Sequence, residues 1–333
     1  MQMPRVTVII PAYNRARYLG EAIRSVLEQT FRDFELLVVD DGSTDQTAEL
    51  IGSISDPRVR YLPQSHRGIS PSLNAGLRAA RGECVARLDS DDCWLPDMLE
   101  SLVAVLDSRS DIGVAYGRGQ VMDHEGRWLS HSFGTPERFR GDSLRSLVYD
   151  DCTCNIALLA RRACFDRAGL YDETLPANED WDMWLRVARH YRFAFVDKVL
   201  ACIRWHDDNL TGLTSPQLAV VLETRTMPLD KLFSDPQLPA AIRAMHPIAY
   251  TNVYLFRSQR WLQKRNFRMA GEELRRAMRV SHQPLTTGVR MAWLAVAVPV
   301  LRRHSLGQRA LTALSNWRRH RHGGSHPTRP PGG

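Results

Sequence analysis

Short hydrophobic runs alternate with amphipathic stretches through most of the first 200 or so residues. The runs are rich in Val, Ile and Leu and too short for helices, so they predict buried strands. They span residues 6–10, 36–39, 59–62 and 85–88. The stretches between them carry hydrophobic residues at helical spacing and span residues 16–29, 43–51 and 70–80. Ser43 precedes Gln46 by three residues, which predicts a capping box at the start of the second helix.

Strands and helices continue to alternate up to about residue 204. Residues 117–150 show no clear period, so they predict an irregular surface excursion. Because helix-length connections join the strands, we expect a largely parallel, doubly wound sheet. Trp181 and Trp184 share one face of a predicted helix and are interpreted as core residues. The predicted elements are helices at 94–107 and 178–190, and strands at 114–116, 155–161, 193–196 and 199–204.

The character of the chain changes near residue 213. Beyond it, amphipathic pieces predict helices at 217–233, 239–261 and 266–281. The last residues are rich in Gly, Pro and His, a composition typical of disorder. We therefore expect an α/β domain over residues 1–213, a helical C-terminal region over 214–320 and a disordered tail over 321–333.

Charge is distributed unevenly along the chain. The formal net charge is +7, yet the segment from Leu274 to the end holds eleven arginines and no acid, so the rest of the chain is mildly acidic. An arginine-rich segment that also contains Trp293, Leu294 and Trp317 suits the interface of an anionic membrane. Solvated disorder is the alternative that stays open. We expect no nucleic-acid partner, because the sequence contains no recognised nucleic-acid-binding module.

Cysteine usage and hydropathy bear on the compartment. The six cysteines lack the spacing of a zinc site and are interpreted as reduced thiols of a cytosolic protein. The N-terminus lacks the pattern of a secretory signal. The longest apolar run, residues 291–301, is shorter than the roughly 20 residues that span a membrane. We expect a cytoplasmic protein, at the inner face of the cell membrane if the basic region binds lipid.

Three groups of carboxylates stand where a predicted strand ends or a predicted helix begins. Open α/β sheets bind ligands at the carboxyl ends of their strands, and Mg²⁺ often shares one or two carboxylates with substrate phosphates. The second group therefore predicts a metal–diphosphate site, with helix capping as the alternative. The groups are Asp40 with Asp41, then Asp89 with Asp91 and Asp92, then Glu179 with Asp180.

The order and spacing of these motifs resemble the family 2 glycosyltransferases with the GT-A fold. The resemblance implies a Rossmann-like, mostly parallel sheet flanked by helices, here with a helical C-terminal extension. It also implies inverting transfer of a sugar from a UDP- or GDP-type donor to a hydroxyl of a glycan or lipid-linked saccharide, with Mg²⁺ or Mn²⁺ as cofactor. The matching pieces are Val8–Asn14, Val38–Asp45, Asn74–Leu77, Ala80–Glu83, Leu88–Asp92, Gly169–Glu173, Glu179–Trp181 and Arg204–His206 with Asn209.

The resemblance assigns donor contacts to residues after the first strands. Pro11, Tyr13 and Asp40 are expected to hold the nucleotide base, and Asp89 to face the ribose. Asn74 lies in a matching motif and is expected at the donor site. Many members have an arginine just before this asparagine, where the present chain has Ser72-Leu73, so Arg67 is the candidate to replace it.

The resemblance assigns the chemistry to the later motifs. Asp91 is expected to ligate the metal, with His206 as a second candidate ligand. Asp180 matches the general base that takes the proton of the acceptor hydroxyl. A helix N-terminus favours an ionised carboxylate, as a base requires. Glu179 competes with Asp180 for this role.

Two other classes of function remain open from the sequence. A nucleotidyltransferase that makes sugar nucleotides would carry a Gly-rich, basic loop after the first strand, where this chain has Pro11-Ala12-Tyr13-Asn14. A non-catalytic scaffold would fit better if Asp91 or Asp180 were missing, and both are present.

Overall fold

The structure is a computed structural model that describes residues 3–206, 209 and 212–281. The chain divides into two compact units, the first ending at Tyr250 and the second beginning at Thr251. The arginine-rich segment beyond residue 281 and the tail predicted at 321–333 lie outside the described residues. In the part of the chain that is described, no helix is long and apolar enough to cross a membrane.

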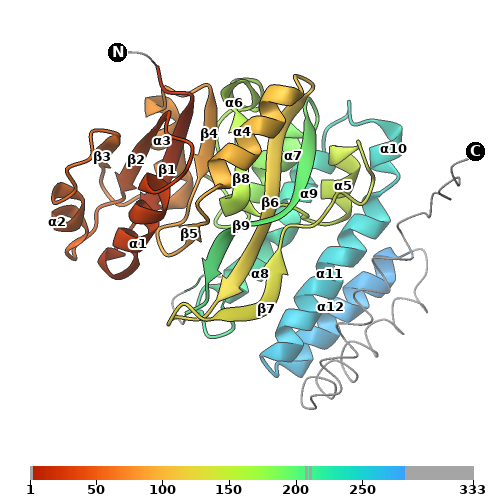
Figure 1. Cartoon of the computed structure of the whole chain (residues 1–333). Helices are drawn as coiled ribbons and strands as arrows, with labels where there is room; N and C mark the ends of the chain where they lie inside the picture. The colour runs from red at the N-terminus through yellow and green to blue at the C-terminus, as the bar shows by residue number, and fades with distance from the viewer. Residues whose placement is uncertain (1–2, 207–208, 210–211, 282–333) are drawn as a thin grey trace, which may run out of the picture. The chain divides into compact units, whose positions relative to one another are not determined.

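A single mixed sheet of nine strands forms the centre of the first unit (Figure 1). Its order is β3-β2-β1-β4-β8-β6-β9-β5, and β7 pairs with β6 outside this path. Six strands run in one direction, because β8, β5 and β7 are the antiparallel members. The strands are β1 Val6–Ala12, β2 Phe34–Asp40, β3 Val59–Pro63, β4 Cys84–Arg87, β5 Cys93–Trp94, β6 Ile112–Met122, β7 Trp128–Phe133, β8 Leu158–Arg161 and β9 Arg192–Arg204.

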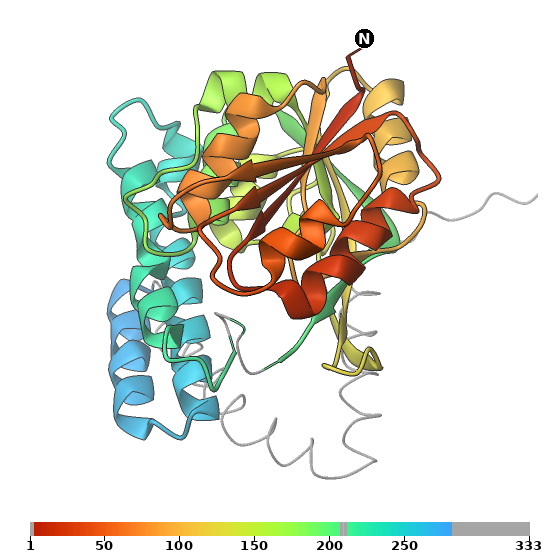
Figure 2. The ribbon, with the colours of Figure 1, turned by 90° about the vertical axis from the view of Figure 1, so that its left-hand side faces the viewer.

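Helices cover both faces of the β1–β2 region, as Figure 2 shows. On one face, Val8 and Ile10 of β1 join the same hydrophobic cluster as Leu19 of α1. On the other face, Ile9 lies against α3, and a Cβ added at Gly76 would come within 2.6 Å of it, so glycine permits this close packing. The helices are α1 Ala16–Leu27, α2 Thr47–Gly52, α3 Ile69–Ala79, α4 Met98–Ser108, α5 Ser143–Tyr149, α6 Arg162–Ala168 and α7 Glu179–Val187.

The first unit continues beyond residue 213, where the sequence predicted a domain boundary. Helix α9 packs on α7, and α10 contacts α5, so these later helices belong to the same compact body as the sheet. The elements are α8 Leu218–Glu223, the short 3₁₀ helix η2 Thr224–Thr226, α9 Met227–Phe233 and α10 Ala240–Arg243. The helical character expected after residue 213 is confirmed up to residue 280.

The second unit begins within α11 (His246–Gln263) and continues into α12 (Phe267–Val280). Leu255 and Ala277 form its small hydrophobic cluster. Arg257 and Glu273 are almost fully buried and pair at 2.8 Å, so the two helices share an ion pair as well as an apolar contact.

Three local predictions were wrong. Residues 117–150 are not irregular throughout, because β6 extends to Met122 and β7 and α5 follow. The two strands predicted over 193–204 form one strand, β9. Ser43 does not cap α2, which begins at Thr47, because its hydroxyl accepts a hydrogen bond from the backbone N–H of Asn14 instead. That tertiary contact ties the ends of β1 and β2 together.

Candidate functional site

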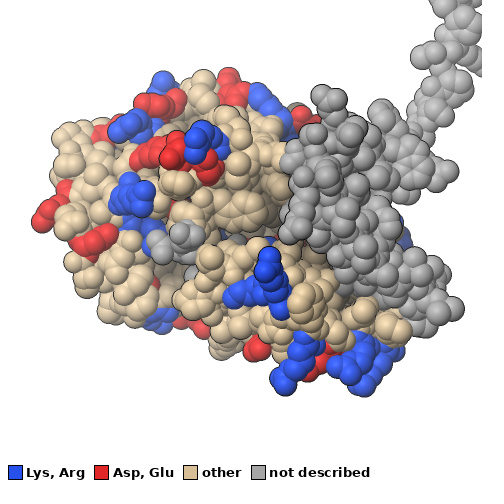
Figure 3. All heavy atoms as spheres, turned by 90° about the horizontal axis from the view of Figure 1, so that it is seen from below, with Lys and Arg blue, Asp and Glu red and all other residues tan. Residues whose placement is uncertain are grey.

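The carboxyl ends of the parallel strands bring the first two carboxylate groups to one edge of the sheet. Ala12 at the end of β1 pairs in register with Asp40 at the end of β2, and Ile9 pairs with Arg87 at the end of β4. Figure 3 views the first unit from the side on which β6 ends, the same end of the sheet. Charged side chains of both signs are scattered over the described part of this side, with uncharged surface between them.

Asp40 and Asp41 are both buried, and their carboxylates have different hydrogen-bond partners. The carboxylate of Asp40 accepts from the backbone N–H of Ser43 at 3.0 Å and from the hydroxyl of Tyr61 at 2.7 Å. Burial and this bond raise the pKa of Tyr61 to about 12. Asp41 accepts from the backbone N–H groups of Arg67 and Gly68, at 2.9 and 2.7 Å.

The environment of Asp41 favours its ionised form. Burial raises the pKa of this carboxyl, but the hydrogen bonds from Gln64, Arg67 and Gly68 outweigh burial and lower it. A carboxylate that accepts several N–H bonds is stabilised in its charged state. Asp41 therefore fixes the loop between β3 and α3.

Tyr13, the residue predicted to cover a nucleotide base, is partly exposed at the end of β1. Its ring stacks on that of His66, with centroids 4.0 Å apart and planes inclined by 19°. The Nδ1 atom of His66 lies 2.8 Å from a carboxylate oxygen of Asp41. Pro11, one residue before the end of β1, is itself buried. The loop anchored by Asp41 thus carries an aromatic partner for Tyr13.

Arg67 and Asn74 meet at a residue that was not singled out from the sequence. Both donate to Glu173, Arg67 through its guanidinium and Asn74 through its side-chain amide, each at 2.9 Å. The amide oxygen of Asn74 also accepts from the backbone N–H of Tyr171 at 2.8 Å. Asn74 is buried and fully engaged, so it fixes the loop after α6, and its predicted donor contact stays a prediction.

Asp91 and His206, separated by 115 residues, lie together. The Nε2 atom of His206 is 3.0 Å from Oδ2 of Asp91, and the guanidinium of Arg15 lies 3.7 Å from the same oxygen. Burial raises the pKa of Asp91, but the bond with His206 and the charge of Arg15 lower it overall. Asp91 is therefore held as an anion.

Asp92 has a structural role. It is buried and accepts from the backbone N–H of Arg204 at 2.8 Å, which ties the turn after β4 to the end of β9. Burial and the charges of Asp91 and Asp89 raise its pKa well above the usual range. Helix capping does not explain the acidic cluster, because α4 begins at Met98 with Asp97 at its N-cap.

The pair of Asp91 and His206 fits a divalent cation that takes its remaining ligands from a substrate. A carboxylate oxygen and an imidazole nitrogen are both ligands for Mn²⁺, and Mg²⁺ is usually bound through only one or two carboxylates plus phosphates. Among the described residues there is no group of three or more His, Cys, Asp or Glu side chains arranged to hold an ion by themselves. The donor set therefore suits a metal shared with phosphate oxygens.

Arg87 connects the second and third carboxylate groups. Its guanidinium donates to Asp89 at 2.7 Å and to Glu179 at 3.1 Å. Burial opposes the charge of Arg87, but the two carboxylates raise its pKa well above the usual value. In the sequence, the only signal for this role is the position of an arginine inside a hydrophobic strand. The acidic groups predicted to share one site are thus linked directly.

Glu179 and Asp180 differ in their surroundings. Glu179 is buried and paired with Arg87, and burial together with the charge of Asp180 raises its pKa. Asp180 is only half-buried. Its Oδ1 accepts from the backbone N–H of Trp181 at 2.7 Å, and its Oδ2 accepts from the side-chain amide of Asn155. Asp180 is therefore the more accessible carboxylate of the two.

Two residues near Asp180 were missed in the sequence. The side-chain amide of Asn155 donates a hydrogen bond to Asp180, and Asp151 lies close enough for electrostatic repulsion between the two carboxylates. Burial and the charge of Asp180 raise the pKa of Asp151 to about 7. Both residues lie in or just before the short 3₁₀ helix η1 (Asn155–Ala157), which follows α5. The sequence predicted a strand over residues 155–161, but Asn155–Ala157 form this 3₁₀ helix and β8 begins only at Leu158, so the strand pattern did not indicate that Asn155 lies beside Asp180.

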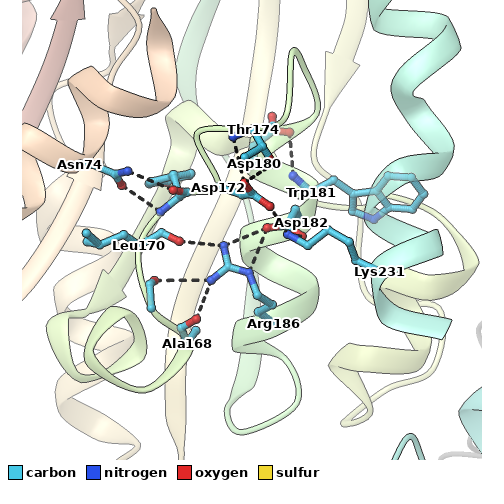
Figure 4. Close-up of polar contacts among 12 residues, drawn as sticks. Asn74, Ala168, Leu170, Asp172, Thr174, Asp180, Trp181, Asp182, Arg186 and Lys231 are labelled. Atoms are coloured by element: carbon cyan, nitrogen blue, oxygen red, sulfur yellow. Dashed lines mark hydrogen bonds and ion pairs between the residues drawn. The ribbon is translucent and has the colours of Figure 1, made fainter. Parts of the chain in front are cut away.

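A network of charged side chains ties α7 to α9 and to the loop after α6 (Figure 4). Lys231 of α9 lies 2.7 Å from Asp182 and 2.6 Å from Asp172. Arg186 pairs with Asp182 at 2.9 Å and donates to the carbonyl oxygens of Ala168 and Leu170. Asp182 is buried, so these two cations compensate its charge. The network fixes the first turn of α7, which carries Asp180.

Comparison with known proteins identifies the family and the fold. The model of the family described as "Glycosyl transferase family 2" matches residues 7–165. An uncharacterized glycosyltransferase of Rickettsia typhi is 33% identical over 227 residues, which cover 65% of this chain and 68% of that protein. The match spans only 30 to 35% of the length of three longer Rickettsia relatives.

Two solved structures share the fold. The S. aureus TarS fragment 1–349, in complex with UDP-GlcNAc, matches with a TM-score of 0.60 and 19% identity, over 89% of this chain and 91% of that chain. The mannosyltransferase PcManGT from Pyrobaculum calidifontis, in complex with GDP-Man and Mn²⁺, matches with a TM-score of 0.60 and 21% identity, over 93% and 84%. The predicted α/β fold with flanking helices is confirmed.

Proposed function

The chain belongs to glycosyltransferase family 2, and on that premise we propose that it transfers a sugar, with inversion, from a nucleotide diphosphate donor to a hydroxyl of a glycan or lipid-linked saccharide. One observation carries the proposal: Arg87 joins Asp89, after β4, to Glu179, beside Asp180, so the donor and acceptor carboxylates share one edge of the sheet. The alternative of a non-catalytic scaffold gives no reason for this convergence.

The proposed binding site for the nucleotide sugar begins at the carboxyl ends of β1 and β2. Tyr13 offers an aromatic face for a nucleotide base, and Asp40 retains acceptor capacity beside it for a base N–H. UDP-GlcNAc in the TarS fragment and GDP-Man in PcManGT support a nucleotide sugar as the donor. Asp89 faces the ribose in this proposal.

Asp91 and His206 are the residues that would hold Mg²⁺ or Mn²⁺. A bound cation would stabilise the negative charge that develops on the departing diphosphate. The Mn²⁺ in the PcManGT complex supports this cofactor. Arg15, 3.7 Å from Asp91, adds a positive charge to the same place.

Asp180 is the proposed general base. It is half-buried and keeps lone pairs beyond those used by Trp181 and Asn155, so it can accept the proton of an acceptor hydroxyl. Glu179 is less suited, because it is buried and paired with Arg87. Attack by the acceptor oxygen opposite the leaving diphosphate inverts the anomeric carbon.

A screen of nucleotide sugars tests the proposal. Hydrolysis of UDP- and GDP-linked hexoses and N-acetylhexosamines is measured at high protein concentration, with and without Mn²⁺. We expect one donor to be cleaved in the presence of the cation. Asp180→Asn should lower turnover at least about 1,000-fold with little change in donor affinity. Asp166→Asn, at an exposed position, serves as control.

Asp91→Ala separates the transferase from a scaffold. It should weaken donor binding and remove its dependence on Mn²⁺, which titration calorimetry with UDP and GDP measures. Failure of wild-type protein to bind either nucleotide, with or without the cation, would leave the scaffold as the better description.

We also propose that the arginine-rich segment contacts anionic membrane, close to lipid-linked acceptors. The composition of that segment supports this location at the inner face of the cell membrane. A full-length variant with Arg302, Arg303, Arg318 and Arg319 changed to Gln should lose co-sedimentation with phosphatidylglycerol vesicles. Equal co-sedimentation of this variant and wild type contradicts the membrane contact.

A further inference from the structure

The half-exposed carboxylate of Asp180 is held by an amide whose orientation is chemically determined. The indole N–H of Trp184 donates to Oδ1 of Asn155, and Nδ2 of Asn155 donates to Oδ2 of Asp180. An indole N–H can only donate and an ionised carboxylate can only accept. Only one orientation of the amide satisfies both neighbours, so Trp184 decides which end of Asn155 faces Asp180.

Both ends of this chain of hydrogen bonds are anchored. Trp184 is 3% exposed, on the buried face of α7. Ile156, next to Asn155, is buried, and its carbonyl oxygen accepts from the indole of Trp94. Neither the donor nor the backbone of Asn155 can shift without disturbing the core.

We propose that Asn155 is a positioning residue that fixes the carboxylate plane of Asp180 toward the acceptor, and that Trp184 fixes Asn155. The inference rests on the proposed role of Asp180 as general base. A base must lie within hydrogen-bonding reach of the proton that it takes, and misplacement by about 1 Å can lower the rate about 100-fold. Oδ1 is fixed by the backbone N–H of Trp181, so Asn155 supplies the second point that stops the carboxylate from rotating.

Other charged groups surround Asp180, and each acts on it differently. Glu179 is its neighbour on α7, Arg87 reaches the pair from β4, and Asp151 approaches from the segment before η1. The hydroxyl of Tyr171, in the loop after α6, also lies in the field of Asp180. None of these charged groups fixes the orientation of the carboxylate, because among the described residues the side-chain hydrogen bond to Asp180 comes from Asn155.

Two tryptophans of α7 provide a matched pair of variants. Trp181 and Trp184 are both buried, and each indole N–H donates one hydrogen bond, Trp181 to the carbonyl oxygen of Leu147 and Trp184 to Asn155. Phenylalanine at either position removes an indole and its bond, so the loss of stability should be similar. Only Trp184→Phe frees the amide that holds Asp180.

The first measurement needs no substrate. In protein labelled with ¹⁵N-tryptophan, the indole N–H signal of Trp184 should shift as pH is lowered and carboxylates take up protons. This shift should disappear in Asp180→Asn and in Asn155→Ala, while the signal of Trp181 keeps its behaviour. A Trp184 signal whose pH response survives Asp180→Asn overturns the connection, whether or not the protein proves to be a transferase.

The second measurement uses the nucleotide sugar that wild-type protein cleaves. Asn155→Ala should lower kcat about 10- to 100-fold and change donor KM less than twofold, and Trp184→Phe should lower kcat about tenfold. Asn155→Asp places a second carboxylate against Asp180, so the acidic limb of the pH–rate profile should move to higher pH. Equal rates and pH profiles for Trp184→Phe and Trp181→Phe overturn the positioning role. Absence of cleavage by wild type refutes the proposed function instead, and the indole titration then decides the inference alone.

Discussion

Carboxylates after β2 are held mainly by backbone N–H groups, whereas those around α7 are held mainly by side chains from other elements. Asp41 accepts from the backbone of Arg67 and Gly68, and Asp45 accepts from the backbone of Ala16. By contrast, Glu179 pairs with Arg87 and Asp182 pairs with Lys231. The second group can therefore be disrupted by single substitutions on distant elements, whereas disruption of the first requires changing the carboxylate itself.

The difference matters because the two groups serve opposite sides of the proposed reaction. A backbone N–H donor at the donor side does not depend on the side chain of its residue, although Gly68 has a φ of +98° that favours glycine. Side-chain donors at the acceptor side make the position of Asp180 depend on Asn155, Lys231 and Arg186 together. Four substitutions test this contrast, in decreasing order of expected effect.

Arg87→Met should have the largest effect, because it leaves Glu179 buried without its cation and also releases Asp89. Removing one partner of a buried ion pair costs about 3 to 5 kcal/mol in the free energy of unfolding. Urea denaturation measures this loss. Arg109→Met, which breaks an exposed pair with Asp111, should cost less than about 1 kcal/mol. Similar losses in both variants would contradict the central role of Arg87.

Asp41→Asn tests the carboxylate held by the backbone. In the variant, the NH₂ group of the amide replaces one carboxylate oxygen and must face at least one backbone N–H that now donates to Asp41. That N–H loses its acceptor, so we expect the free energy of unfolding to fall by about 3 kcal/mol. It should also weaken UDP or GDP binding, because the loop that carries His66 loosens. Asp123→Asn alters a carboxylate of similar bonding in the β6–β7 turn and should leave nucleotide affinity unchanged. Equal nucleotide affinities in the two variants would contradict a role of this loop in nucleotide binding.

Lys231→Met should lower the free energy of unfolding by about 2 kcal/mol, because Asp182 keeps its pair with Arg186 but loses its second cation. It should lower turnover as well, since the first turn of α7 carries Asp180. Lys198→Met breaks the more exposed pair with Asp97 and provides the control. Unchanged turnover after a measurable loss of stability would show that α9 supports the fold but not the chemistry.

Asp151→Asn should cause the smallest loss of stability, and its effect should be visible as a change in the pH dependence of stability. The pKa of Asp151 is about 7 in the folded protein, because of burial and the charge of Asp180, and lies near 3.8 when unperturbed. The folded state therefore keeps a proton that the unfolded state loses as pH rises from about 4 to 7, so stability falls across this window. Asp151→Asn should remove most of this fall, measured as the change of the urea midpoint between pH 4 and pH 7. Asp166→Asn should leave the slope unchanged.

Part of the candidate site was readable from the sequence because it depends on local pattern. Short β-branched runs predicted the strands, and polar residues directly after them predicted the edge at which Asp40 and Asp89 lie. The proximity of Asp91 and His206 was expected from the resemblance, and the two are in contact. The predicted catalytic, donor and metal roles of these residues stay predictions.

Other parts could not be read because no local pattern encodes them. Ser43 matches a capping motif, yet its hydroxyl accepts a hydrogen bond from the backbone N–H of Asn14. The two loops meet only in the folded sheet, so this contact cannot be seen in the local sequence. Residues 117–150 have no period because β7 is exposed at every position and β6 is buried at nearly all, so neither strand alternates.

The sequence by itself determined the α/β fold, the edge of the sheet that carries the carboxylates, and the helical character after residue 213. Strand and helix periodicity are properties of neighbouring residues, and parallel strands necessarily end on one side. Only the tertiary structure decided that Arg87 neutralises Glu179, that Asn155 and Trp184 hold Asp180, and that Lys231 of α9 compensates Asp182. These partners are separated by 25 to 92 residues, so their pairing depends on packing that no short segment contains.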